Sequence, residues 1–285
     1  MSDRLIGIRA KIERAKEHVR NLESTMQAFR GSDPYGFRID DDPETGDKIH
    51  RIQIRSQTPC SFSLIAGDAI HNIRSALDHL ACRLVEANGR QPHGSTYFPI
   101  AETFEKYKAS KGGKVEGMSA VAKDLIDATK PYGESGGTDD LWALHRLDIH
   151  DKHKLLMVTA FSISAVRMSW RTGGTPAYLG VLTKIDGVPP FEVTLNVPTV
   201  NGVINQKLSI NVPIGASPEG KLSFFEDGTE IGRMLSPVNP DAYFQLTSEI
   251  AFREPEIVKG KPVIPFINQL AHLVDSIVSQ FVPLL

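Results

Sequence analysis

The sequence of 285 residues predicts an α+β fold, in which a helical bundle built from long N-terminal and C-terminal helices is joined to an antiparallel β-sheet region. Three observations predict it: apolar residues recur at helical spacing through the first half of the chain, alternate with polar residues further on, and return to helical spacing at the end. The expected parts are a mainly helical bundle over 1–153 with a β-hairpin near 36–55, a sheet region over 154–260, and a C-terminal helix over 261–285 that packs back on the bundle.

The first predicted helix covers residues 3–29. Its apolar residues are spaced alternately three and four positions apart, as in a heptad repeat: Leu5, Ile8, Ile12, Ala15, Val19, Leu22, Met26 and Phe29. Such a helix is about 40 Å long, and so narrow an apolar seam needs a partner helix. The partner is either another helix of the same chain or a helix of a second copy, and the pattern leaves both open.

Turn residues and helix breakers delimit the next elements. The sequence Asp-Pro-Glu-Thr-Gly-Asp separates two short alternating runs, 37–39 and 49–54, and this predicts a hairpin. A second long helix is expected over 61–88, where a glycine follows its last apolar residues. Shorter helices are expected over 119–130 and 139–150.

Strict alternation of apolar and polar residues marks the second half of the chain. It is clearest over 191–197, 207–212 and 243–253, and prolines and glycines separate these runs. Such alternation is typical of an antiparallel sheet with one buried and one solvated face. The chain closes with a predicted helix over 266–282.

Composition excludes several classes of protein. Apolar residues make up 41% of the chain and the formal net charge is −2, which argues against a disordered chain and against a surface coated in positive charge for nucleic acid. The first residues contain no apolar run like a signal peptide, and no stretch is long and apolar enough for a membrane span. The two cysteines, Cys60 and Cys82, are too far apart along one helix for a disulfide. We therefore expect a cytoplasmic protein with reduced thiols and no membrane partner.

The segment Gly67 to Leu80, GDAIHNIRSALDHL, carries short hydrogen-bonding residues where a solvated helix would carry Lys and Glu. On a helical projection they form two stripes beside the apolar face, one with Asp68, Asn72, Ser75 and His79, the other with His71, Arg74 and Asp78. Two interpretations stay open: a hydrogen-bond network between helices of the bundle, and a functional polar face.

A second polar cluster lies in Leu144 to Lys154, LHRLDIHDKHK, at the end of one predicted helix. Its candidate site residues are Asp151, Lys152 and His153, which would join His71 if the two segments face each other. Charged residues at a helix C-terminus are also simple partners of the helix dipole, so a structural interpretation stays open here too.

The run Arg74-Ser-Ala-Leu-Asp-His79 resembles the Arg-x(4–6)-His signature of HEPN domains, helical-bundle proteins many of which are metal-independent ribonucleases. Many active HEPN motifs have Asn, Asp or His directly after the arginine, whereas this chain has Ser75. More broadly, GDAIHNIRSALDHL followed by DKHK looks like a family of uncharacterised bacterial proteins, from which no activity carries over.

The HEPN resemblance implies RNA cleavage or RNA binding with no metal and no cofactor. His79 would act as acid or base on the RNA 2′-hydroxyl and Arg74 would clamp the phosphate, with Asp78 or Asn72 orienting them. Pairing of two such motifs implies a homodimer through helices.

Two alternatives from other classes remain. One is a non-enzymatic binding or assembly protein with a structural polar core, whose sheet could recognise a partner through Phe224, Phe225, Tyr243 and Phe244. The other is a His/Asp metal site between facing helices, because His and Asp are acceptable metal ligands, although no stretch has the spacing of a known zinc motif.

Overall fold

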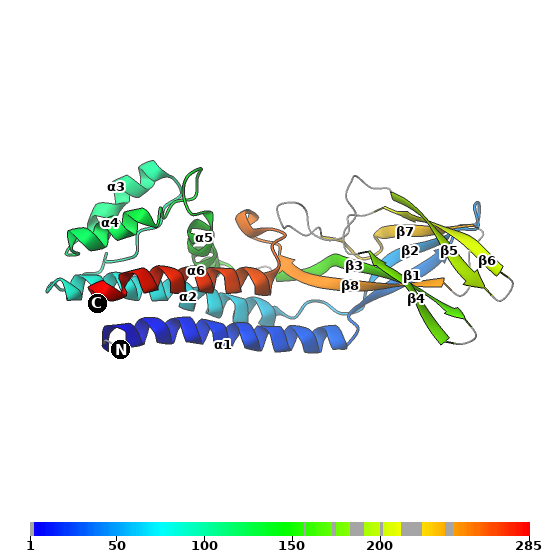
Figure 1. The fold of residues 1–285 in the computed structure, drawn as a ribbon, viewed down its shortest axis with the longest axis horizontal. Coiled ribbons are helices and arrows are strands. Elements are labelled where there is room, and N and C mark those ends of the chain that lie inside the picture. Colours follow the sequence, from blue (N-terminus) through cyan, green and yellow to red (C-terminus); the bar gives the residue numbers. More distant parts are fainter. Residues whose placement is uncertain are drawn as a thin grey trace.

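Helices and strands occupy opposite ends of an elongated molecule in the computed structural model (Figure 1). The structure describes residues 3–156, 158–172, 175–182, 191–199, 202–211, 224–236 and 242–285. The described residues form six α-helices and eight β-strands, so the predicted α+β class is confirmed.

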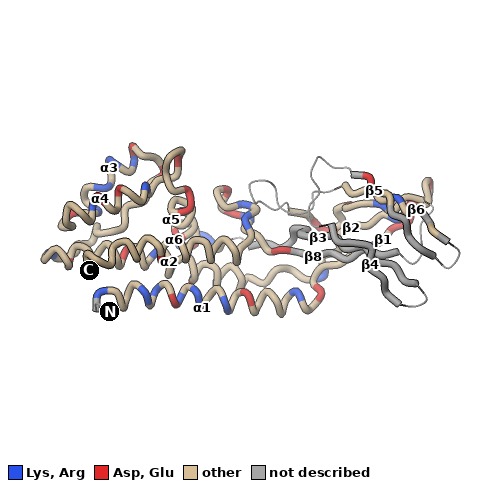
Figure 2. The backbone as a smooth tube through the Cα atoms, viewed as in Figure 1, with Lys and Arg blue, Asp and Glu red and all other residues tan. Residues whose placement is uncertain are grey.

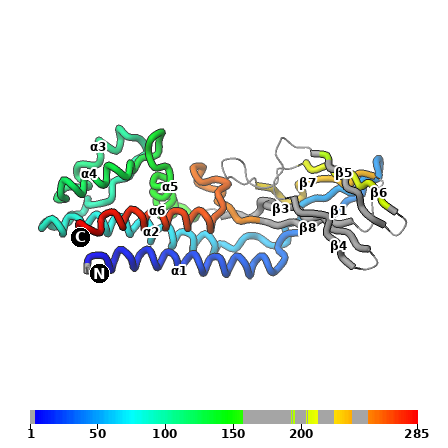
Figure 3. The backbone as a smooth tube through the Cα atoms, in the orientation of Figure 1, coloured from blue at the N-terminus to red at the C-terminus, as the bar shows by residue number. Residues whose placement is uncertain are grey.

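Three long helices form the centre of the bundle: α1 (Asp3–Gly31), α2 (Cys60–Ala87) and α6 (Val263–Phe281). The heptad seam of α1 is buried against α2 and α6 from Leu5 to Met26, so its partners belong to the same chain. The two ends of the chain lie at the same end of the bundle (Figure 3), where Arg4 Nη1 donates to the carbonyl oxygen of Leu285 at 3.0 Å. Helix α6 thus ties the last residues to the first ones.

Three shorter helices pack around this centre: α3 (Phe104–Lys114), α4 (Ala120–Ala128) and α5 (Asp139–His153). The sequence analysis missed α3, because this Lys-rich segment has no apolar periodicity and ends in two glycines; the Thr103 hydroxyl caps it by accepting from Lys106 N. Helix α5 runs three residues further than predicted, so Asp151, Lys152 and His153 are helical.

The strands form two antiparallel sheets rather than one. The five-stranded sheet has the order β1-β2-β7-β6-β5 and the three-stranded sheet the order β4-β3-β8. Their bounds are β1 Tyr35–Asp41, β2 Lys48–Ile54, β3 Val158–Thr172, β4 Thr175–Leu182, β5 Phe191–Thr199, β6 Gly202–Ile210, β7 Glu230–Leu235 and β8 Ala242–Phe252. The predicted hairpin is β1–β2, and it belongs to the five-stranded sheet, because β2 pairs with β7.

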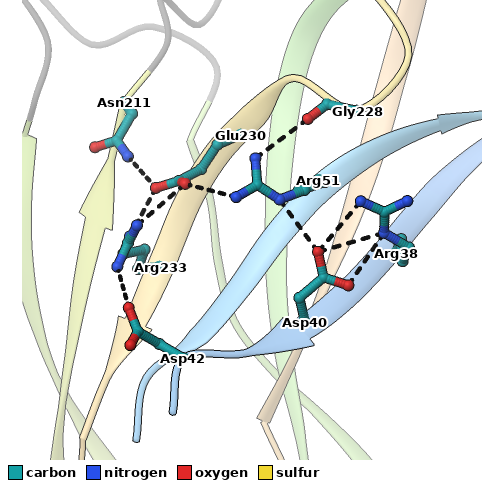
Figure 4. A network of polar contacts seen from close by, with 8 residues as sticks. All are labelled: Arg38, Asp40, Asp42, Arg51, Asn211, Gly228, Glu230 and Arg233. Carbon is teal, nitrogen blue, oxygen red and sulfur yellow. Dashed lines mark hydrogen bonds and ion pairs between the residues drawn. The ribbon is translucent and has the colours of Figure 1, made fainter. Parts of the chain in front are cut away.

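An ion-pair network crosses one face of β1, β2 and β7 (Figure 4). Arg51 joins Asp40 (3.1 Å) to Glu230 (3.3 Å), and Arg233 joins Glu230 (2.7 Å) to Asp42 (2.8 Å). Each arginine of this network is paired with a carboxylate, so the network itself has no unbalanced positive charge. Along α1 as well, Lys and Arg are interspersed with Asp and Glu (Figure 2). Among the described helices, none has the length and apolar character needed to cross a membrane.

Candidate acid–base site between helices α2 and α5

His71 on α2 and Asp148 on α5 meet where these two helices contact each other. Their atoms His71 Nδ1 and Asp148 Oδ1 are 3.0 Å apart. The Asp148 side chain is 5% exposed and the His71 side chain 52% exposed. A carboxylate accepts, so Nδ1 carries the hydrogen, and in the neutral ring Nε2 then has the lone pair. The pair is therefore a buried carboxylate that orients a half-exposed imidazole.

Lys152 supplies a positive charge beside this pair. Its Nζ donates to Asp148 Oδ2 at 2.5 Å from one turn further along α5, and its side chain is 53% exposed. Each oxygen of the Asp148 carboxylate thus has one partner, which satisfies a buried charge. The two polar segments of the sequence are joined here, through Asp148 rather than through Asp151 or His153.

Asp151 lies directly on the backbone of α2 at Gly67. A Cβ built on Gly67 would stand 2.3 Å from Asp151 Oδ1, closer than any allowed contact, so the glycine lets the end of α5 approach α2. Burial raises the pKa of Asp151, and the neighbouring carboxylates of Asp68 and Asp148 raise it further. This carboxyl group therefore accepts a proton more readily than an ordinary aspartate.

We expect Gly67→Ala to have different effects in two backgrounds. Alone, the new methyl group must displace the Asp151 carboxyl group, which offsets the better helix propensity of alanine, whereas in Asp151→Ala that propensity remains in full, about 1 kcal/mol of stabilisation. Urea unfolding of the four proteins in this double-mutant cycle measures the difference. Equal effects of Gly67→Ala in both backgrounds would contradict the close approach.

Arg74 and Asp78 together hold both backbone polar groups of one residue, Phe98, in the connector after α2. Arg74 Nη1 donates to Asp78 Oδ1 (2.6 Å) and Nη2 donates to the Phe98 carbonyl oxygen (3.0 Å), while Phe98 N donates to Asp78 Oδ1 (3.0 Å). Arg74 is 5% exposed. The guanidinium is therefore engaged inside the protein, and a phosphate would have to compete with the Phe98 carbonyl for it.

Asn72 and His79 face α1 instead. Lys11 Nζ on α1 donates to Asn72 Oδ1 at 3.3 Å, and a Cβ on Gly7 would lie 3.7 Å from His79 Nδ1. Burial, with the nearby charges of Lys11 and Arg83, lowers the pKa of His79. The two stripes of the α2 polar face thus have different neighbours, and no hydrogen bond joins Arg74 to His79 within the described part of the chain.

The other histidines of the second cluster are not joined to His71. His153 is exposed at the end of α5, and His150 Nε2 lies 3.9 Å from Glu254 Oε2. His145 is largely buried beside Arg74 and Lys114, and burial together with these charges lowers its pKa to about 4. It is therefore neutral at neutral pH.

Asp148 is the functional candidate to which sequence reasoning gave no role. A signal for it exists, because Asp148 lies four residues after Leu144 and seven after Leu141, on the buried stripe of α5. A carboxylate on an apolar stripe must find a partner. The partner, His71, lies on another helix, and the sequence alone does not indicate the contact.

Among the described residues, no group of three or more His, Cys, Asp or Glu side chains is placed to hold a metal ion. Comparisons with protein-family models, with curated proteins and with solved structures found no match. The HEPN resemblance therefore stays a prediction.

Proposed function

We propose that this protein binds and cleaves RNA without a metal ion, and that His71 is its acid–base group. One observation carries the proposal: the buried Asp148 carboxylate fixes Nδ1 of a half-exposed imidazole. A histidine held in this way keeps its other nitrogen available for proton transfer. RNA is the proposed substrate because the run from Arg74 to His79 resembles the HEPN signature.

The reaction moves one proton and exchanges one bond. His71 Nε2 takes the proton of the RNA 2′-hydroxyl, the 2′-oxygen bonds to the adjacent phosphorus, and the bond from phosphorus to the 5′-oxygen breaks. The imidazolium of His71 returns this proton, through water, to the leaving 5′-oxygen, so the products are a 2′,3′-cyclic phosphate and a 5′-hydroxyl. Asp148 stabilises the imidazolium that forms. Lys152, beside it, offers a positive charge to the phosphate.

In this proposal the residues of the Arg-x(4)-His run take supporting roles. Arg74 and Asp78 fix the connector at Phe98, next to the α2 turn that carries His71. His79 is the alternative acid–base group that the resemblance implies. It faces α1, whereas His71 has the carboxylate-fixed Nδ1 on which the proposal rests, and this favours His71 over it.

A cytoplasmic location and a homodimer belong to the same proposal. RNA is abundant in the cytoplasm. Both cysteines are free thiols, which is the state that a reducing compartment maintains. A dimer would use a surface other than the seam of α1, because that seam is buried within the chain.

The second candidate is a non-enzymatic binding or assembly protein with a structural polar core. The closed set of hydrogen bonds among Arg74, Asp78 and Phe98 supports it, since these bonds serve the fold alone. Of the aromatic residues considered for a recognition surface, Phe224 and Phe225 are half-buried. The side chains of Tyr243 and Phe244 lie outside the described residues.

Asp148→Asn tests the proposal against this second candidate. Labelled RNA is incubated in EDTA with wild type and variant, and the cleavage products are analysed for a cyclic phosphate. We expect the variant to cleave about 100-fold more slowly or worse, because the amide no longer stabilises the imidazolium. Lys154→Gln is the matched control: it removes an exposed lysine just after α5 that has no role in the proposed reaction, so its cleavage rate should stay at the wild-type level. Unchanged cleavage by Asp148→Asn, in a variant that melts cooperatively, would contradict the proposal.

A further inference from the structure

A hollow that does not include the His71 site lies where the helical bundle meets the sheets. It has a volume of about 420 Å³ and is lined by the end of β2, the first residues of α2, the residues after α5, the loop before β7 and the end of β8. None of its lining residues belongs to the polar stripes of α2 or to the second cluster. The size falls near the lower end of the range for small-molecule sites, about 300–1,000 Å³.

Apolar residues are part of the lining of this junction cavity. Tyr35, Leu155 and Phe225 are among them, and Leu155 is 46% exposed. Exposure of apolar surface to water costs about 25 cal/mol per Å². A ligand whose apolar group covers Leu155 would remove part of this cost and so gain binding free energy.

Charges of both signs line the same space. Arg253 stands at the end of β8, and Glu226 and Asp227 stand in the loop before β7. Within the described part of the chain, none of the three takes part in an ion pair. Asp227 is held in place, because its Oδ1 accepts from Ile54 N at 2.8 Å. The cavity thus presents one cation and two carboxylates that do not neutralise each other.

Hydroxyl groups complete the lining. Tyr35 Oη and Thr58 Oγ1 are 3.3 Å apart, and Ser63 at the start of α2 lines the cavity as well. Hydroxyls both donate and accept, so they suit the polar centre of a ligand whose two ends carry opposite charges.

We propose that the junction cavity binds a small zwitterion: an amino acid, or a dipeptide, with an apolar side chain. Its carboxylate pairs with the Arg253 guanidinium, whose fork of donors matches two carboxylate oxygens. Its ammonium faces Glu226 and Asp227, and its side chain covers Tyr35 and Leu155. A ligand with only one charge would leave one of the opposing groups unpaired in the complex. This site is independent of the proposed RNA cleavage.

Cys60 gives a direct readout, because it is an exposed free thiol in the lining of the cavity. Cys82 is the internal reference: it lies elsewhere on α2, and burial raises the pKa of its thiol. The wild-type protein is alkylated with iodoacetamide, with and without L-phenylalanine at millimolar concentration, and each cysteine is followed by mass spectrometry. We expect phenylalanine to slow alkylation of Cys60 and to leave that of Cys82 unchanged.

Two analogues with the same ring test the charges. Hydrocinnamate lacks the ammonium and phenylalaninol lacks the carboxylate, and we expect each to protect Cys60 at least tenfold more weakly than phenylalanine. Equal protection by either analogue, or no protection by phenylalanine and by an apolar dipeptide, overturns the assignment.

Arg253→Met should weaken protection by phenylalanine about tenfold, a loss of about 1.4 kcal/mol. The matched control, Arg20→Met on the exposed face of α1, should have no effect.

Discussion

Replacing Arg74 with methionine is expected to lower the free energy of unfolding by about 3–5 kcal/mol, because the change breaks a buried ion pair and leaves its partners in place. Asp78 would keep a carboxylate without its cation, and the Phe98 carbonyl would lose its donor. Phe98 lies in the core, where an unpaired polar atom is costly, whereas the Asp78 side chain is 26% exposed and regains part of its hydration. Urea unfolding followed by circular dichroism measures the loss.

The double variant Arg74→Met, Asp78→Leu separates this explanation from a simple loss of packing. Removing both charges avoids the unpaired carboxylate, so the double variant should be more stable than the sum of the single changes predicts. The Phe98 backbone groups stay unpaired and keep part of the cost. If Arg74→Met lowers the free energy of unfolding by less than about 1 kcal/mol, Arg74 is not the buried structural residue described above.

Stability is expected to fall steeply as the pH drops from about 6.5 to about 4. Burial lowers the pKa of His50 on β2 to about 4, and burial beside Arg74 and Lys114 lowers that of His145 to about 4. In this window the unfolded chain takes up protons at both histidines while the folded chain takes up fewer, so protonation favours unfolding. Each histidine contributes up to about 3 kcal/mol at the low end of the window.

The raised pKa of Asp151 acts in the opposite direction, because the folded state binds its proton more tightly than the unfolded state does. The histidine effect should exceed it, since two groups contribute. Urea midpoints at pH 7 and pH 5 for wild type, His50→Gln and His145→Gln test this, and each variant should lose less stability over the interval. A wild-type midpoint that does not change between the two values would rule the effect out.

Local patterns in the sequence predicted most of the helices. The heptad seam from Leu5 to Met26 depends on residues within one helix, so its burial was predictable from the spacing, whereas its partners, α2 and α6, were not. The Lys-rich helix α3 was missed because its stability comes from a capping threonine and from Tyr107, its one buried side chain. An apolar period is absent there, so periodicity had nothing to detect.

Contacts between distant segments limited the prediction of sheets and site. Strand β2 pairs with β7, with His50 opposite Gly232 in the register, and no local pattern indicates that pairing. The candidate site also depends on contacts between distant segments. The sequence predicted polar residues on one side of α2, yet which of them face α1 and which face α5 depends on the packing of helices. His71 and Asp148 are 77 positions apart in the chain and meet only through that packing.

The rate of RNA cleavage by the His71→Ala variant tests the central claim most directly. Wild type, His71→Ala and His79→Ala are compared on one labelled RNA in EDTA, under single-turnover conditions and at equal folded concentration. We expect His71→Ala to cleave about 10²–10⁴-fold more slowly than wild type, because this is the usual contribution of an acid–base group. We expect His79→Ala to keep a rate of the same order as wild type. Cleavage by His71→Ala at the wild-type rate, or a wild-type protein that neither binds nor cleaves RNA, would contradict it.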